Sequence, residues 1–225
     1  MKSGILHQVL KHVDSLDKEI LQKKEKNQDQ DVRYHRLRIW TRGFRVSLDE
    51  LEQSIYCCQK WGSLLNKKFE DEMHEEELMN YHRYIYFYKN AIIRLFSLLD
   101  KMGYFLNDLY NLRTEKIKTH FSYFTVLRRM GNLQKETDLQ KKLLQIKIKN
   151  RALTNKLRKQ RNTEIHWMNA EMLDDFIESH PYSNDRIQIE DHLEQLTDLQ
   201  QSFEMVCQVM LVVFSYHQKM RFKKQ

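Results

Sequence analysis

Turn-forming residues are scarce in this chain, with one Pro and five Gly among 225 residues. All-β folds need many Gly- and Pro-rich corners, so this scarcity argues against them and favours long, uninterrupted helices. Apolar residues make up 41% of the chain, which is enough to build a packed core around such helices. The sequence therefore predicts an all-α protein.

Apolar residues that recur every three or four positions indicate where the amphipathic helices lie. This spacing predicts helices over residues 3–27, 47–66, 71–112, 133–160, 170–179 and 185–222. Ser47 and Glu50 have capping-box spacing and are predicted to begin the second of these helices. Gly103 is expected to end or bend the third. For residues 32–46 the pattern leaves two interpretations open, an extended segment or a short helix.

The predicted architecture is an antiparallel helical bundle of four long helices with extra N-terminal helices. We expect residues 1–70 to form an N-terminal helical extension and residues 71–225 to form the bundle. No secretory signal is visible, and the longest apolar run, over 206–214, is too short to cross a bilayer, so we expect a cytoplasmic protein without a membrane partner. The sequence shows no Gly-rich phosphate loop and no paired-cysteine zinc signature, so no metal and no cofactor are expected.

Positive charge is concentrated in one segment of a chain whose formal net charge is +7. Nine basic residues and no Asp or Glu lie between Lys141 and Arg161. Such a stripe attracts polyanions through counterion release, although a solvated face balanced by acidic helices is the alternative interpretation. We predict that five members of this stripe bind nucleic acid: Lys149, Arg151, Lys156, Arg158 and Lys159.

The basic segment ends in the sequence KLRKQRNTEIH, over residues 156–166, which contains the candidate catalytic residues Arg161, Asn162 and His166. These residue types suit attack of an RNA 2′-hydroxyl on its own phosphodiester. Histidine can accept or give the proton, arginine can hold the phosphate, and Asn162 can orient either group. On a continuous helix Arg161 and His166 point about 140° apart. They would therefore converge only at a helix break or when two chains pool their side chains across a symmetry axis.

The segment LRKQRNTEIH resembles the signature of the HEPN superfamily (higher eukaryotes and prokaryotes nucleotide-binding), which is Arg, a polar residue, three to five further residues and His. The aromatic-rich segment over residues 86–112 also resembles a core helix of an uncharacterised bacterial subgroup of that superfamily. Together the two matches suggest that roughly residues 75–220 belong to the family. By this resemblance Arg161 is the motif Arg, Asn162 its polar neighbour and His166 the motif His.

The resemblance implies a helical homodimer that joins two motifs in a cleft and cleaves RNA without a metal, in a toxin, defence or RNA-processing role. An antitoxin or a regulatory protein is a further implied partner. Met168 stands where HEPN toxins paired with a nucleotidyltransferase antitoxin have a modified Tyr, which argues against that particular pairing. The alternative function is a non-catalytic HEPN-like bundle that binds nucleic acid or protein.

Overall fold

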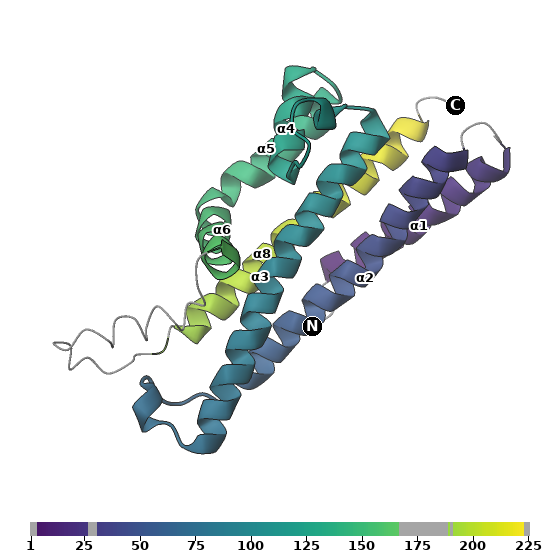
Figure 1. The fold of residues 1–225 in the computed structure, drawn as a ribbon. Helices are drawn as coiled ribbons and strands as arrows, with labels where there is room; N and C mark the ends of the chain where they lie inside the picture. The colour runs from purple at the N-terminus through teal and green to yellow at the C-terminus, as the bar shows by residue number, and fades with distance from the viewer. Residues whose placement is uncertain (1–3, 27–30, 167–188, 190, 223–225) are drawn as a thin grey trace. The chain divides into compact units, whose positions relative to one another are not determined.

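The computed structural model describes residues 4–26, 31–166, 189 and 191–222, which form α-helices joined by short connections (Figure 1). The helices are α1 (Gly4–Lys26), α2 (Asp31–Gly62), α3 (Glu75–Tyr110), α4 (Tyr123–Asn132), α5 (Thr137–Lys149), α6 (Arg151–His166) and α8 (His192–Phe222). Two short 3-10 helices, η2 (Glu70–Glu72) and η3 (Thr114–Lys116), lie in the connections. The part of the chain described here contains no β-strand, so the predicted all-α bundle is confirmed. The predicted helix over 170–179 and the position of Met168 lie outside the described residues.

The chain divides into two compact units, each built from several separate segments. The first unit comprises residues 1–50, 95–150 and 203–225, and the second comprises residues 51–94 and 151–202. The helices α2, α3 and α8 each contribute to both units. The sequence-based division at residue 70 stays a prediction.

In the first unit, α1 runs antiparallel to the first part of α2 (Figure 1). Ion pairs support this arrangement, with Arg38 Nε 3.2 Å from Asp17 Oδ1 and Arg45 Nη1 2.7 Å from Asp14 Oδ1. Residues 32–46, for which the sequence left an extended segment or a short helix open, are helical and belong to the long helix α2.

The predicted helix start at Ser47 is wrong, because α2 continues through this residue. Ser47 is buried, and its Oγ accepts a hydrogen bond from Lys101 Nζ at 2.7 Å. Ser47 therefore does not cap a helix but binds a lysine of α3, a contact that the spacing of Ser47 and Glu50 does not reveal.

Three aromatic rings from three helices form the centre of the first unit. Phe44, Phe105 and Phe214 pack edge to face, with ring centroids 5.4 to 5.9 Å apart. All three side chains are less than 2% exposed. Edge-to-face packing of buried rings adds stabilisation beyond the area that they bury, so this cluster holds α2, α3 and α8 together within this unit.

Gly103 does not end the helix, since α3 runs on to Tyr110, and the alternative that it bends the helix stays a prediction. The glycine serves close packing instead. A Cβ atom at position 103 would lie 2.8 Å from Tyr123 Cα and 2.9 Å from Tyr123 N. The backbone N–H of Tyr123 donates to Asp100 Oδ1 at 3.1 Å, which fixes the start of α4 against this turn of α3.

The single helix predicted over 133–160 is also wrong, because the chain leaves helical geometry at Asn150, where φ is −103° and ψ is 20°. The backbone N–H of Asn150 and its side-chain amide both donate to the carbonyl oxygen of Ile146, at 3.1 and 2.9 Å. Asparagine competes for backbone hydrogen bonds in this way, which makes it a poor residue for a helix interior. The basic segment is therefore shared between α5 and α6.

The second unit packs α6 and the first part of α8 with the adjoining parts of α2 and α3. Tyr81, Ile85, Tyr88 and Ile92 of α3 are buried, as their spacing predicts. Leu193 also fits the apolar spacing of its helix, which predicts a buried side chain, but it is 65% exposed. It lies in the first turn of α8, which begins at His192 rather than near residue 185.

Candidate functional site

The sequence motif Arg161–Asn162–x3–His166 occupies the last turns of α6. This helix is continuous from Arg151 to His166, so no helix break brings the motif residues together. The backbone positions of Arg161 and His166 are therefore separated by about 140° around the axis. The side chain of His166 lies outside the described part of the structure.

Asn162 holds the side chain of Arg161, its neighbour in the motif. The Arg161 guanidinium donates to Asn162 Oδ1 from Nε at 3.2 Å and from Nη2 at 2.7 Å. Asn162 is four positions before His166, a spacing that places two backbone positions on the same side of a helix. The contact therefore directs the guanidinium towards the side of α6 on which His166 is placed. The spacing of Arg161 and His166 in the sequence suggested that their side chains diverge, and it did not reveal the contact between Arg161 and Asn162.

Two polar contacts anchor the motif turns of α6 on α3. Tyr88 Oη donates to Gln160 Oε1 at 3.0 Å, and Lys89 Nζ forms an ion pair with Glu164 Oε2 at 3.2 Å. Gln160 and Glu164 are one helical turn apart and bracket the Arg–Asn pair. The Lys89 and Glu164 side chains are 20% and 21% exposed, so water screens their interaction only partly.

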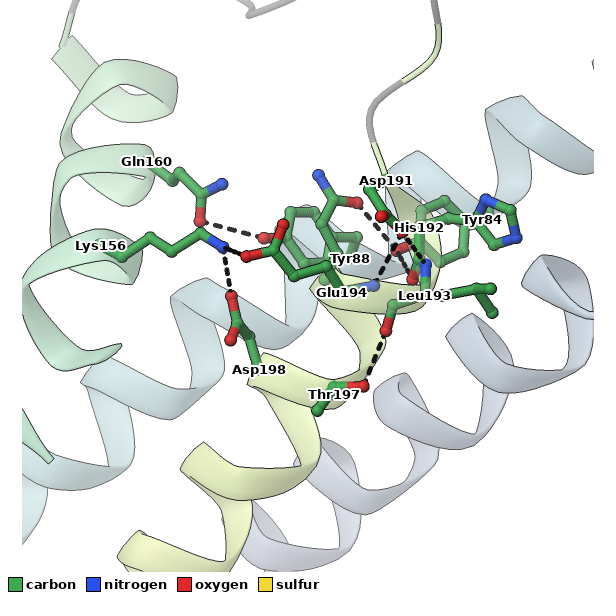
Figure 2. A network of polar contacts seen from close by, with 11 residues as sticks. Tyr84, Tyr88, Lys156, Gln160, Asp191, His192, Leu193, Glu194, Thr197 and Asp198 are labelled. Carbon is green, nitrogen blue, oxygen red and sulfur yellow. Dashed lines mark hydrogen bonds and ion pairs between the residues drawn. The ribbon is translucent and has the colours of Figure 1, made fainter. Parts of the chain in front are cut away.

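A second set of contacts ties α6 to the first turns of α8 (Figure 2). Lys156 Nζ lies 2.7 Å from both Glu194 Oε1 and Asp198 Oδ2. The hydrogen bonds to Asp198 and Glu194 raise the pKa of Lys156. Its ammonium group is thus held between two carboxylates, and its predicted contact with nucleic acid stays a prediction.

The start of α8 is itself well fixed. The backbone N–H groups of Glu194 and Leu193 each donate to Asp191 Oδ1 at 3.0 Å, and they lower the pKa of this N-terminal capping carboxylate. Tyr84 Oη of α3 donates to Gln195 Oε1 at 2.8 Å in a buried setting. The helix α6, which carries the motif, is thus joined to α3 and α8 by side-chain hydrogen bonds and ion pairs within the second unit.

The predicted nucleic-acid-binding residues are divided between the two units. Lys149 is exposed at the end of α5 in the first unit, and the other four lie on α6 in the second. On α6, Arg151 and Lys159 are exposed and Arg158 is half-buried. Exposed cations without a carboxylate partner described above are available to phosphate, so Lys149 on α5 and Arg151 and Lys159 on α6 are the best placed of the five.

Sequence reasoning missed the residues that hold α6 in place. Tyr88 and its neighbours carry an apolar pattern, which predicts burial of the ring but not the bond made by its hydroxyl group. For Glu164 a signal existed, since it is the sole acidic residue between Lys141 and His166. An isolated carboxylate in a basic segment calls for a cationic partner when it is partly buried.

The described residues contain no group of three or more His, Cys, Asp and Glu side chains that could hold a metal ion. Among the same residues, no helix combines the length and apolar character that crossing a membrane requires.

The described part of the chain is all-helical, as the resemblance to HEPN proteins implied. A family model for Cthe2314-like HEPN proteins matches residues 40–218, and the chain belongs to this family. The match begins well before residue 75, where the sequence motifs placed its start, and so includes part of α2. Comparisons with curated proteins and with solved structures found no match.

Proposed function

We propose that this protein is a metal-independent endoribonuclease that acts as a homodimer, with Arg161, Asn162 and His166 as its catalytic residues. The observation that carries the proposal is the double contact between the Arg161 guanidinium and Asn162. It holds the cation on the side of α6 where His166 is placed, at the end of a helix with five basic residues. Toxin, defence and RNA-processing roles in the cytoplasm all suit such an activity.

The proposed reaction is transfer of a phosphoryl group within the RNA strand. The 2′-oxygen forms a bond to the adjacent phosphorus, and the bond from phosphorus to the 5′-oxygen breaks. A base takes the proton of the 2′-hydroxyl, and an acid gives a proton to the departing 5′-oxygen. The products are a 2′,3′-cyclic phosphate end and a 5′-hydroxyl end, so no water, metal ion or redox partner enters this step.

Each motif residue has a distinct proposed role. His166 serves as the general base or acid, because an unperturbed imidazole titrates near neutral pH. The planar fork of Arg161 stabilises the charge that develops on the phosphate oxygens. Asn162 orients the guanidinium through the observed hydrogen bonds.

The reaction needs both a base and an acid, whereas each chain supplies one motif histidine. Two copies of α6 at a shared cleft would provide two histidines and two arginines. Dimerisation would also overcome the separation of about 140° between the motif positions on one helix. Arg151 and Lys159 are the proposed contacts to the flanking phosphates.

Cleavage of a fluorescent single-stranded RNA in EDTA tests this proposal. The proteins compared are wild type, Arg161→Ala, His166→Ala and the control His7→Ala, which removes an exposed histidine of α1 outside the family match. Loss of general acid–base catalysis should slow cleavage by about 10²- to 10⁴-fold in His166→Ala. Loss of the charge-stabilising donor should slow it by about 10²- to 10³-fold in Arg161→Ala.

The ends of the fragments and the mass of the protein complete the test. Cyclic phosphate ends and a dimer by light scattering are expected for wild type. Equal cleavage by wild type and His166→Ala would assign the activity to a contaminant or to another site. RNA binding without cleavage by a folded dimer would identify a non-catalytic HEPN protein instead.

A further inference from the structure

The ion pair between Lys89 and Glu164 places one charged contact inside the candidate motif. Glu164 lies between Asn162 and His166 in sequence, and it is the sole carboxylate of α6. Its Oε2 atom is 3.2 Å from Lys89 Nζ of α3. Glu164, the acidic residue within the motif, is thus paired with a cation.

We propose that Lys89 is a positioning residue for phosphate binding at the motif, because it neutralises Glu164. This inference rests on the proposed function. Lys89 acts through Glu164 and has no role in the chemical step. The substrate group whose binding it supports is a phosphodiester of single-stranded RNA.

The spacing within α6 explains why the charge of Glu164 matters. Residues three positions apart on a helix are neighbours, with Cβ atoms about 5–6 Å from each other, and Arg161 and Glu164 have this spacing. A carboxylate without its partner would attract the guanidinium and repel an incoming phosphate. Both effects weaken RNA binding, and pairing with Lys89 suppresses both.

The pair is well placed to have this effect. Both side chains are about one-fifth exposed, so their charges are screened less than those of surface pairs. The neighbouring bond from Tyr88 to Gln160 holds the same turns of α6 on α3 but carries no charge. Tyr88→Phe therefore provides a matched variant that loosens the same contact without changing the electrostatics.

Binding can be measured separately from cleavage with a fluorescent RNA in which every ribose is 2′-O-methylated, since this oligonucleotide lacks the attacking hydroxyl. Fluorescence anisotropy would give Kd at 50 and 300 mM salt for wild type, Lys89→Ala, Glu164→Gln, the double variant and Tyr88→Phe. Arg45→Ala controls for the loss of one positive charge, because Arg45 lies on α2 in the first unit and pairs with Asp14. All proteins are measured well below their melting temperatures.

At low salt, Lys89→Ala should raise Kd about fivefold through the unpaired carboxylate, and the double variant should return to within twofold of wild type. The effect of Lys89→Ala should shrink at high salt, because salt screens the repulsion. Tyr88→Phe and Arg45→Ala should change Kd by less than twofold. Rescue by Glu164→Gln separates neutralisation of charge from a merely structural role.

Other results would overturn the inference. These results are binding of Lys89→Ala equal to that of wild type, weak binding by the double variant, and a loss of binding in Tyr88→Phe as large as that in Lys89→Ala. If wild type binds the methylated RNA but fails to cleave unmodified RNA, only the proposed nuclease activity is refuted. The Kd values of the variants for the methylated RNA then still decide the role of Lys89. Absence of RNA binding by wild type would refute both proposals.

Discussion

Replacing Gly103 with Ala is expected to destabilise the protein, although alanine is the better helix former. In the interior of a helix, Gly to Ala normally gains about 0.5–1 kcal/mol. At position 103 the new Cβ would lie 2.8 Å from Tyr123 Cα, a backbone atom that cannot move aside as a flexible side chain can. Overpacking of this kind costs about 1–3 kcal/mol, so the net loss should be about 1 kcal/mol.

Gly43 in α2 provides the matched control for this prediction. It also lies within a helix of the first unit, but a Cβ there would have no atom within 4 Å beyond its chain neighbours and the adjacent backbone of its own helix. Gly43→Ala should therefore stabilise the protein by about 0.5–1 kcal/mol. Because both substitutions share the helix-propensity gain, the difference between them isolates the cost of the close approach, which should be about 1–3 kcal/mol.

Urea unfolding and thermal melting, both followed by circular dichroism, would measure both variants against wild type. For a chain of this size, each kcal/mol should shift the melting temperature by about 2–4 °C. Gly103→Ala should melt below wild type and Gly43→Ala above it. If Gly103→Ala proved as stabilising as Gly43→Ala, the reasoning that α3 and the start of α4 leave no room for a Cβ atom at position 103 would be refuted.

Further predictions concern single side chains of the second unit. Tyr84→Phe should cost about 0.5–1.5 kcal/mol in urea unfolding, because it removes the buried hydrogen bond from Tyr84 Oη to Gln195 Oε1; an unchanged midpoint would contradict this. Burial raises the pKa of Cys58 to about 12, so mass spectrometry after iodoacetamide treatment at pH 8 should find native Cys58 unlabelled and the half-buried Cys57 labelled first. The pKa of Asp191 is lowered in the folded protein, so the ionised carboxylate stabilises the fold above about pH 4. This stabilisation is lost as the pH falls through the folded-state pKa. Asp191→Asn should therefore melt at a temperature that depends less on pH on the acid side than the melting temperature of wild type does.

The helical fold was accessible from sequence because helix formation here depends on local patterns. Few breakers and regular apolar spacing identified most of the helices and their buried faces, including that of α3. The errors occurred where a residue's role depends on distant contacts. Ser47 looked like a cap and Gly103 like a stop, yet each meets a partner from a remote segment of the first unit.

The candidate site was predictable in part for the same reason. Arg161, Asn162 and His166 stand close together in sequence, so a short motif revealed them. The basic run indicated a polyanionic partner. No short motif, however, could reveal that Lys89 pairs with Glu164, since the two residues come from helices far apart in the chain.

The sequence by itself determined the all-α class, the HEPN family resemblance and the position of the motif in the chain. Each of these follows from residue type and short-range spacing. Only the tertiary structure decided that α2 continues through Ser47, that α5 and α6 separate at Asn150, and that polar contacts fix the motif turns on α3. The physical reason is that a buried or paired polar group is stable only with a partner, and folding chooses that partner from anywhere in the chain.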